Sequence, residues 1–312
     1  MTSTPPLPDR PRPHRTLGDP DSHFIEVEGV DVHTKIKGTG PPDLVLLHHF
    51  YGHVWAWRHV QDLLADQART IAFDRPGFGL TERVHPSAWP HGNPYTRASS
   101  VQLMVGLLDH LEIDRAVLVG SSAGGTVALE AWSLVPERIS GLVLLSPAVT
   151  GDVGAPEALR PLLRTAPARR LAPRIAERVA SGITHHRVGR SWHDSSRVSD
   201  EDVHAYSRPL EAEGWQHGFW DVMTAEPRPR HRRTLRTITV PTLVLAGSSD
   251  RTVPPRLSRG VAAAIPTSEY RLLDGCGHTP HEECPGQVAT AISEFLARLG
   301  ADTDGATASS SG

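Results

Sequence analysis

The hydrophobic positions of the chain follow two alternating patterns. Aliphatic runs of about four to eight residues bounded by turn residues are typical of buried strands, and longer segments repeat apolar residues at helical spacing. This alternation predicts a parallel sheet covered by helices. Glu28-Gly29 separates the first two strands, which are predicted to pair as an antiparallel hairpin at the sheet edge. The predicted strands are residues 24–27, 30–37, 44–49, 70–74, 116–120, 141–146, 242–247 and 269–273. The predicted helices are residues 54–66, 96–111, 123–134, 255–264 and 286–299.

The alternation stops between the strands at 141–146 and 242–247. Residues 150–225 in this interval are rich in Arg and patterned as several helices. So long a connection is not a loop, and it is predicted to form a helical cap over the carboxyl edge of the sheet, where open α/β folds bind ligands. Residues 23–149 and 226–299 then form the core, an eight-stranded and mostly parallel sheet flanked by helices.

Both ends of the chain lack the apolar residues of a packed segment. Residues 1–22 are rich in Pro and charge, and residues 300–312 are mostly small or polar. Both segments are predicted to be disordered, because neither could bury enough apolar surface to offset its ordering entropy. The start of the chain has no apolar signal-peptide core, and no apolar stretch approaches a membrane span. A cytoplasmic location without membrane contact is expected.

Charge and cysteine content restrict the partners. The 32 basic and 35 acidic side chains nearly cancel, which leaves a net charge of −3 without the basic surface typical of nucleic-acid binding. A small, apolar substrate is the expected partner, and the oligomeric state stays open. Two cysteines are too few for a disulfide framework and fit a reducing compartment, but a secreted protein without bridges would have the same content, so the cysteines do not decide the compartment. Cys276 is predicted to be a small buried residue.

Candidate chemistry lies where the strand at 116–120 continues into GSSAGG. Ser122 has Gly two positions before and two positions after it, the G-x-S-x-G pattern of a nucleophile on a tight strand-to-helix turn. The small neighbours let other backbone approach, and the helix that follows directs its first amides toward a developing oxyanion. The pattern predicts Ser122 as a nucleophile and Ser121 as a packing residue.

A serine nucleophile needs a base, and the base needs a group that orients it. Asp250 follows the strand at 242–247, and His278 follows the strand at 269–273. Both loops leave the sheet at the edge that carries Ser122, so the three side chains are predicted to form a triad in the chain order Ser, Asp, His. The structural alternatives are a surface position for His278 and a helix N-cap for Asp250.

The chain resembles the α/β-hydrolase superfamily over residues 24–150 and 226–299. The resemblance rests on LLHHFYGHVWAWR, DRPGFGLTER, NPYTRASSVQLMVGLLDHL, GSSAGG, PTLVLAGSSDRTVP and GCGHTPHEECP, which occur in the family's order and spacing. It implies the α/β-hydrolase fold and an oxyanion hole formed by the backbone N–H groups of Phe50 and Ala123. It also implies a structural role beside the site for the loop from Asp74 to Gly79.

One position departs from the family pattern. The family commonly has His-Gly where this chain has His48-His49. Glycine adopts positive φ and leaves room beside a substrate, whereas His49 adds an imidazole. This substitution affects either the oxyanion geometry or the size of the acyl pocket. His49 is interpreted as a group that lines the pocket or as a further hydrogen-bond donor.

Other clusters have structural explanations beside functional ones. Four histidines, His48, His49, His53 and His59, straddle a loop and do not converge as metal ligands, so no metal site and no cofactor are predicted. Six cap arginines either bind an anion or form a solvated face, and the solvated face is favoured. These arginines are Arg160, Arg164, Arg169, Arg170, Arg174 and Arg178. Aromatic residues of the cap either pack it onto the core or line an apolar cavity, and the candidate substrate residues are Trp192, Trp215 and Trp220, beside Tyr206 and Phe219.

The predicted function is hydrolysis of a carboxylic ester or lactone by a serine nucleophile. Hydrolysis of a carbon–carbon bond beside a ketone, or cofactor-free perhydrolysis, would use the same three residues, and a fold alone does not separate these reactions. A ligand-binding protein with little turnover on the same fold is a third alternative. Serine at position 122 argues against enzymes of similar fold that form an alkyl ester on a carboxylate.

Overall fold

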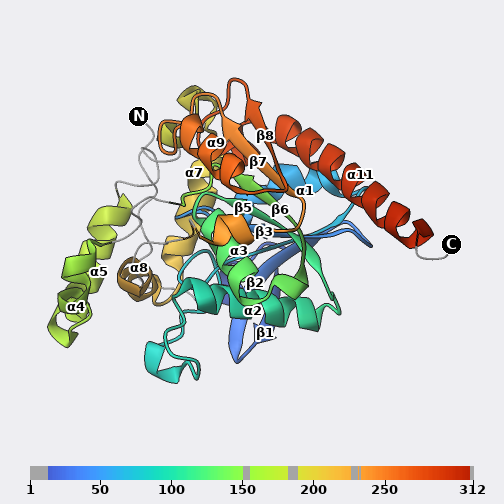
Figure 1. Cartoon of the computed structure of the whole chain (residues 1–312). Coiled ribbons are helices and arrows are strands. Elements are labelled where there is room, and N and C mark those ends of the chain that lie inside the picture. Colours follow the sequence, from blue (N-terminus) through green and yellow to red (C-terminus); the bar gives the residue numbers. More distant parts are fainter. Residues whose placement is uncertain (1–12, 150–154, 182–188, 226–230, 232, 310–312) are drawn as a thin grey trace.

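A computed structural model of the chain describes residues 13–149, 155–181, 189–225, 231 and 233–309. Its centre is an eight-stranded sheet in the order β1-β2-β4-β3-β5-β6-β7-β8 (Figure 1). The first two strands form the predicted antiparallel hairpin, β2 is also antiparallel to β4, and all other neighbours are parallel. The strands are β1 His23–Val27, β2 Val30–Lys37, β3 Asp43–Leu47, β4 Arg69–Phe73, β5 Ala116–Ser121, β6 Ile139–Leu145, β7 Thr242–Gly247 and β8 Ser268–Leu273.

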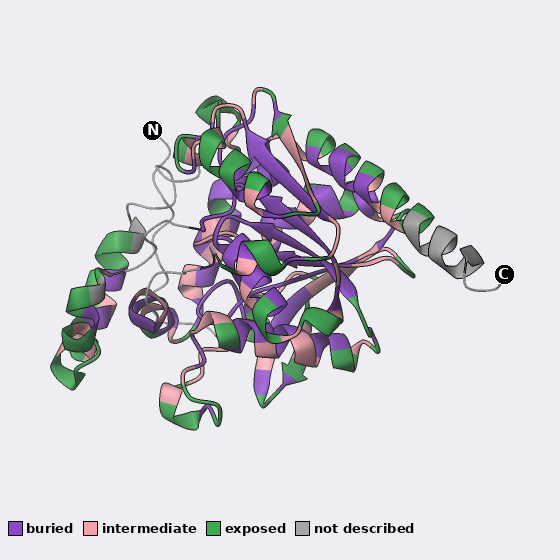
Figure 2. Cartoon of the chain, viewed as in Figure 1, coloured by how far each residue is buried: buried purple, intermediate pink, exposed green. Residues whose placement is uncertain are grey.

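Helices cover both faces of this sheet. One face is packed by α2 Arg97–His110, α3 Ala123–Leu134 and α9 Pro255–Ala264, and the opposite face by α1 Arg58–Leu64 and α11 Pro285–Ser309. Val, Leu and Ile of the central strands, β3 to β7, are buried between these two layers, as the purple interior of Figure 2 shows. The prediction of a mostly parallel sheet covered on both faces is confirmed. Its physical reason is that the side chains of the central strands are apolar on both faces of the sheet, so each face needs a layer of helices to exclude water.

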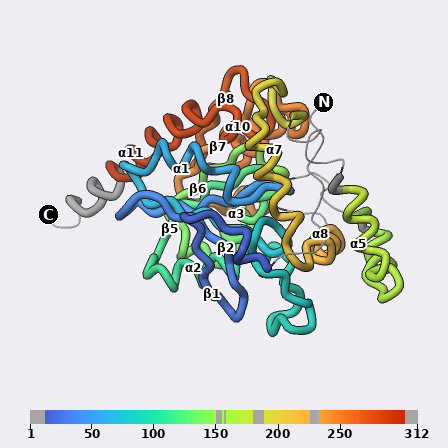
Figure 3. The backbone as a smooth tube through the Cα atoms, turned by 180° about the vertical axis from the view of Figure 1, so that it is seen from behind, coloured from blue at the N-terminus to red at the C-terminus, as the bar shows by residue number. Residues whose placement is uncertain are grey.

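The segment between β6 and β7, called the cap below, is mostly helical where the structure describes it, and residues 150–154 and 182–188 of the predicted cap lie outside the described residues. Its role as a cap over the carboxyl edge of the sheet stays a prediction. The segment contains α4 Arg160–Leu163, α5 Ala166–Ser181, α7 Asp200–Ser207 and α8 Trp215–Ala225. Figures 1 and 3 show α4 and α5 standing away from the sheet and α8 lying between them and the core. Buried alanines of α5 face α8, while much of its remaining surface is exposed. Within the described residues, no helix has both the length and the apolar character needed to cross a bilayer.

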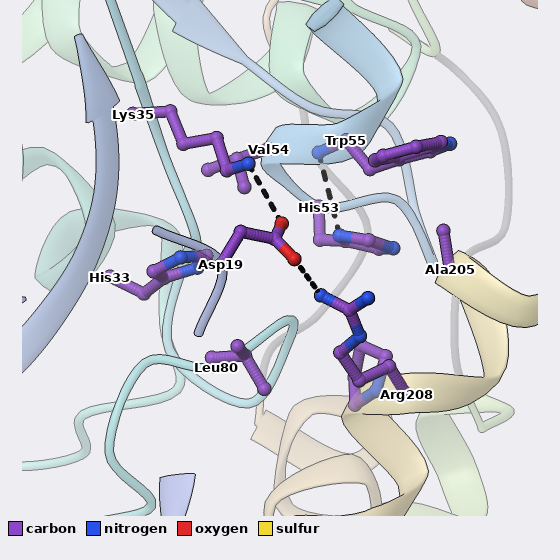
Figure 4. A pocket seen from close by; sticks show the side chains of 10 residues that line it. Asp19, His33, Lys35, His53, Val54, Trp55, Leu80, Ala205 and Arg208 are labelled. Carbon is purple, nitrogen blue, oxygen red and sulfur yellow. Dashed lines mark hydrogen bonds and ion pairs between the residues drawn. The ribbon is translucent and has the colours of Figure 1, made fainter. Parts of the chain in front are cut away.

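The predicted disorder of residues 1–22 is wrong for the described part of that segment. Residues 14–17 form a 3-10 helix, and Leu17 is buried against Leu80 of the core and Ala212 of the cap. Asp19 lies between Lys35 of β2 and Arg208 of the cap and binds both (Figure 4). Composition missed this order because the stabilising partners lie elsewhere in the chain.

The predicted disorder of residues 300–312 is also corrected in part. Helix α11 continues to Ser309, so the segment begins inside a helix. Residues 1–12 and 310–312 lie outside the described residues.

Cys276 and Cys284 form a disulfide with their Cα atoms 6.1 Å apart. Composition did not predict this pairing, although Cys276 is fully buried as predicted. The chain leaves β8 at Leu273, turns through α10 Pro280–Glu283 and returns, which brings the two cysteines together. The bridge therefore encloses the short segment that carries His278.

Candidate active site

Ser122 occupies a strained turn between β5 and α3. Its φ is 50° and its ψ is −110°, a region that residues other than glycine rarely adopt. The surrounding backbone holds this conformation: Ser122 N–H donates to the Leu145 carbonyl at 2.8 Å, and the Ser122 carbonyl accepts from Gly125 and Ala148. Such strain, of order 1–3 kcal/mol, persists only where neighbouring structure fixes it.

The glycines around Ser122 allow backbone segments to meet. A Cβ atom on Gly124 would lie 2.0 Å from the Leu47 carbonyl oxygen, and one on Gly120 would lie 2.7 Å from the Gly124 backbone. Neither position can hold a side chain without moving a strand or the helix. This requirement explains the G-x-S-x-G-G sequence and places the start of α3 against the end of β3.

Three loops bring Ser122, His278 and Asp250 into one hydrogen-bonded series. His278 Nε2 lies 3.0 Å from Ser122 Oγ, and His278 Nδ1 lies 2.8 Å from Asp250 Oδ2. When Nδ1–H donates to the carboxylate, Nε2 is left as the acceptor for the serine hydroxyl. All three residues are at least 94% buried, with exposures of 6%, 6% and 4%. A base within reach of a hydroxyl, oriented by a carboxylate, is the arrangement that activates a serine.

Asp250 uses its two oxygens differently. Oδ2 faces His278, while Oδ1 accepts from the N–H groups of Thr252 and Val253, each at 2.8 Å. The capping alternative and the triad alternative are therefore compatible geometries of one side chain. The two backbone contacts hold the carboxylate in place independently of its contact with the imidazole of His278.

The start of α3 and the turn after β3 lie side by side. Ala123 is the first residue of α3, so its N–H has no carbonyl partner within the helix. The Cβ position of Gly124 is 2.8 Å from the His48 carbonyl oxygen, which places this helix start next to the turn containing His48 to Phe50. The ring of Phe50 packs edge-on against Phe78 at 5.4 Å.

The loop from Asp74 to Gly79 holds this turn. Asp74 accepts from the backbone N–H groups of Val54 and Leu80 at 2.7 Å and lies 2.6 Å from His33 Nδ1. Arg75 donates its side chain to the His48 carbonyl and its backbone N–H to His48 Nε2. These contacts are structural, in line with the interpretation of this loop.

His49 does not adopt the backbone geometry that a glycine would permit. Among the described residues, the non-glycine residues with positive φ are Glu28, Tyr51, Glu112, Ser122 and Ser146, so the left-handed position of this turn falls on Tyr51. The imidazole of His49 lies beside α10, with Nδ1 3.9 Å from Glu282 Oε1. Burial, with the nearby His278, His53 and Arg75, lowers the pKa of His49 to about 3.

Two adjacent glutamates in α10 are site neighbours that the sequence did not single out. Burial raises the pKa of Glu282 to about 7, against the opposing hydrogen bond from Tyr206. Glu283 accepts from the backbone N–H groups of Gly277, His193 and Asp194 at 2.7–2.9 Å. It thereby ties the loop that carries His278 to the cap. The only signal was their place in GCGHTPHEECP.

The three predicted substrate tryptophans lie in different surroundings. The backbone of Trp192 packs on Gly277. Trp192 also lines a cleft of about 490 Å³, and neither Ser122 nor His278 is part of that lining. Trp215 packs in a cluster with Ala176 and Phe219. Trp220 donates Nε1–H to the Leu163 carbonyl at 3.1 Å. The latter two hold α8 to its cap neighbours, and substrate contact by any of the three stays a prediction.

Buried His53 makes stability sensitive to acid. It lines a small cavity of about 20 Å³ beside Asp19 and Arg208 (Figure 4), and burial lowers its pKa to about 4. In the unfolded chain His53 takes up a proton near pH 6.5, whereas in the folded chain it does so only near pH 4. The free energy of unfolding is therefore highest above pH 6.5 and decreases as the pH falls toward 4. The contribution of His53 is at most about 3 kcal/mol.

We expect the variant His53→Gln to lose less stability than wild type between pH 7 and pH 4. Urea unfolding across this range measures the difference. The exposed His110→Gln serves as the matched control and should follow wild type. Identical pH slopes for wild type and His53→Gln would contradict the assignment.

Known proteins resemble the chain over most of its length. The family model for the alpha/beta hydrolase fold matches residues 42–285. A 2-hydroxy-6-oxo-2,4-heptadienoate hydrolase of Pseudomonas putida is 30% identical over 281 residues, covering 86% of this chain and 94% of that protein. An uncharacterised hydrolase of Bacillus subtilis is 28% identical over 279 residues, with coverages of 86% and 96%. The structure of a thermophilic esterase from Thermogutta terrifontis matches with a TM-score of 0.69 and 27% identity, covering 86% of this chain and 94% of that one. The chain therefore belongs to the α/β-hydrolase family.

Proposed function

We propose that the protein is a serine hydrolase that cleaves a carboxylic ester or lactone through an acyl-enzyme on Ser122. The observation that carries this proposal is the series of contacts from Asp250 through His278 to the Ser122 hydroxyl, all buried at one edge of the sheet. Similarity to an esterase of the same fold supports the reaction class.

In this mechanism Ser122 Oγ attacks the ester carbonyl while His278 Nε2 takes the hydroxyl proton. Asp250 holds the imidazole in the required tautomer and stabilises its cation. The N–H groups of Phe50 and Ala123 stabilise the negative oxygen of the tetrahedral intermediate, and one such donor is worth about 3 kcal/mol in the barrier. His278 then protonates the leaving alcohol, and it activates water to release the acid and restore Ser122.

The substrate class is proposed to be small and apolar. Phe219 of the cap stacks on Tyr51 at 5.4 Å, and the neighbouring Phe50 contacts Phe78, so aromatic rings border the turn beside Ser122. The cap arginines with described partners point elsewhere: Arg164 binds the Thr224 carbonyl and Arg169 pairs with Asp221. These contacts favour an uncharged acyl group over an anionic one.

Carbon–carbon bond hydrolysis is the second candidate. It is favoured by the 30% identity to a hydrolase whose name specifies a 6-oxo-dienoate. The same base and nucleophile would serve, but such a substrate carries a carboxylate that a free cation must bind. Turnover of a 6-oxo-dienoate in preference to all esters would select this candidate.

Fluorophosphonate labelling combined with a substrate panel tests the proposal. We expect the probe to modify Ser122, as located by peptide mass spectrometry, and short p-nitrophenyl esters or a lactone to be turned over. Labelling at another serine would eliminate the nucleophile assignment. Labelling of Ser122 without turnover of any ester, lactone or 6-oxo-dienoate would instead favour a binding protein on this fold.

A further inference from the structure

Three side chains that the proposed mechanism does not use converge beside α10. They are His49 from the turn after β3 and His281 and Glu282 from α10. One ligand-type atom from each lies within 4.8 Å of the others. His281 is fully buried and Glu282 is 97% buried, at 0% and 3% exposure, so this is an interior cluster.

Among the described residues, the facing atoms of this cluster accept or donate no hydrogen bond, although His49 Nδ1 and Glu282 Oε1 lie 3.9 Å apart. His49 Nδ1, Glu282 Oε1 and both ring nitrogens of His281 are buried without a hydrogen bond among the described residues. A buried polar group left without a hydrogen bond destabilises the folded protein. Three such groups directed at one another indicate that a further species completes the cluster.

Two imidazoles and a carboxylate are the ligand set of a borderline divalent transition metal. Zinc binds His nitrogen and Glu oxygen at about 2.0–2.2 Å, which separates tetrahedral ligands by about 3.5 Å. The atoms of the cluster need to close by roughly 1–1.5 Å, which rotations of the three side chains can supply. Three protein ligands leave a fourth position open.

The surroundings of the cluster also fit a metal. Tyr206 donates its hydroxyl to Glu282 Oε2 at 2.7 Å, which leaves Oε1 for a ligand and fixes the carboxylate. The carbonyl of His49 accepts from Gly52 N–H and from Arg75, which holds the backbone of that residue.

The cluster borders the cleft of about 490 Å³ through Glu282, whereas His49 and His281 are not part of the cleft lining. The cleft lining carries five carboxylates against two arginines, an excess of negative charge that favours entry of a cation. The carboxylates are Asp62, Glu201, Asp202, Glu282 and Glu283, and the arginines are Arg58 and Arg197.

We propose that His49, His281 and Glu282 bind one divalent transition-metal ion of the zinc type. The site is distinct from the histidine set rejected on sequence grounds, since only His49 is shared and the other ligands come from the far end of the chain. One ligand, His281, lies three residues beyond His278. Another, His49, stands at the position where the family commonly has glycine.

Zinc titration of the full chain, without a polyhistidine tag and after treatment with a chelating resin, tests the site. We expect calorimetry to show one equivalent of Zn²⁺ bound, and Co²⁺ to give the absorption of a four-coordinate centre. His281→Gln should weaken zinc binding by at least about 100-fold, because even outer contacts to metal ligands are worth about 10–100-fold.

Two further variants make the result decisive. His49→Gly restores the residue common in the family, should fold even if His281→Gln does not, and should lose the same affinity. His59→Gln removes an exposed imidazole from the same cleft and should leave zinc affinity unchanged. The proposal is overturned if the protein does not bind one equivalent of zinc, which is the result expected if a water molecule rather than a metal bridges the three side chains. It is also overturned if His49→Gly binds zinc like wild type, or if His59→Gln abolishes binding.

Discussion

Ser122→Ala is expected to lower kcat by about 10⁴–10⁶-fold, the loss typical of removing the nucleophile from a unit of this kind. The Ser122 hydroxyl is the atom within 3.0 Å of His278 Nε2, so the variant keeps the imidazole and carboxylate but has nothing for them to activate. Steady-state turnover of a p-nitrophenyl ester measures the effect. The free energy of unfolding should change little, because alanine has the same backbone strain at φ 50° and the variant loses only the hydrogen bond between the Ser122 hydroxyl and His278.

Ser121→Ala is the matched control for this substitution. The Ser121 hydroxyl is buried without a partner among the described residues, so its removal should leave turnover close to that of wild type. Equal loss of activity in both variants would indicate a general disturbance of the turn between β5 and α3. Retention of activity in Ser122→Ala would exclude an acyl-enzyme on this residue.

Asp250→Asn is expected to lower kcat by about 10³–10⁴-fold with little change in fold. Asparagine has one oxygen where aspartate has two, and the N–H groups of Thr252 and Val253 already require an acceptor. If the amide oxygen serves them, its NH₂ group faces His278 Nδ1. The imidazole must then carry its proton on Nε2, where it cannot accept the serine proton.

The rate of fluorophosphonate labelling at Ser122 should fall together with kcat in this variant, since both depend on the same proton transfer. Asp274→Asn, on the exposed loop after β8, should leave both rates unchanged. Normal labelling in Asp250→Asn would mean that this carboxylate only caps the turn at Thr252 and Val253.

The sheet was predictable because its central strands are apolar on both faces, a pattern set by residues close in sequence. Where the pattern continues past a structural boundary, the prediction fails locally: the third strand was expected to reach residue 49 but ends at Leu47. Beyond Leu47 the His48 carbonyl binds the Arg75 side chain from another loop instead of a neighbouring strand, a tertiary contact that local sequence does not reveal. The positions of Ser122, Asp250 and His278 at strand ends were likewise readable, because parallel strands present their following loops at one edge.

Contacts between distant segments were not readable in the same way. Glu283 binds backbone N–H groups of His193 and Asp194, and no local pattern marks a carboxylate whose partners are main-chain amides of the cap. The pairing of Cys276 with Cys284 depends on the path of the turn between them. Composition treats each of these residues by its type, whereas their surroundings decide what they do.

Asp19 couples the position of the cap to that of the sheet. Its carboxylate is shared between Lys35 in the sheet and Arg208 in the cap, 189 positions later. An outward swing of the cap at Arg208 must break that ion pair or pull the N-terminal segment away from Lys35. Asp19 thus links the sheet to the cap through one carboxylate, and moving either partner away from it separates two opposite charges.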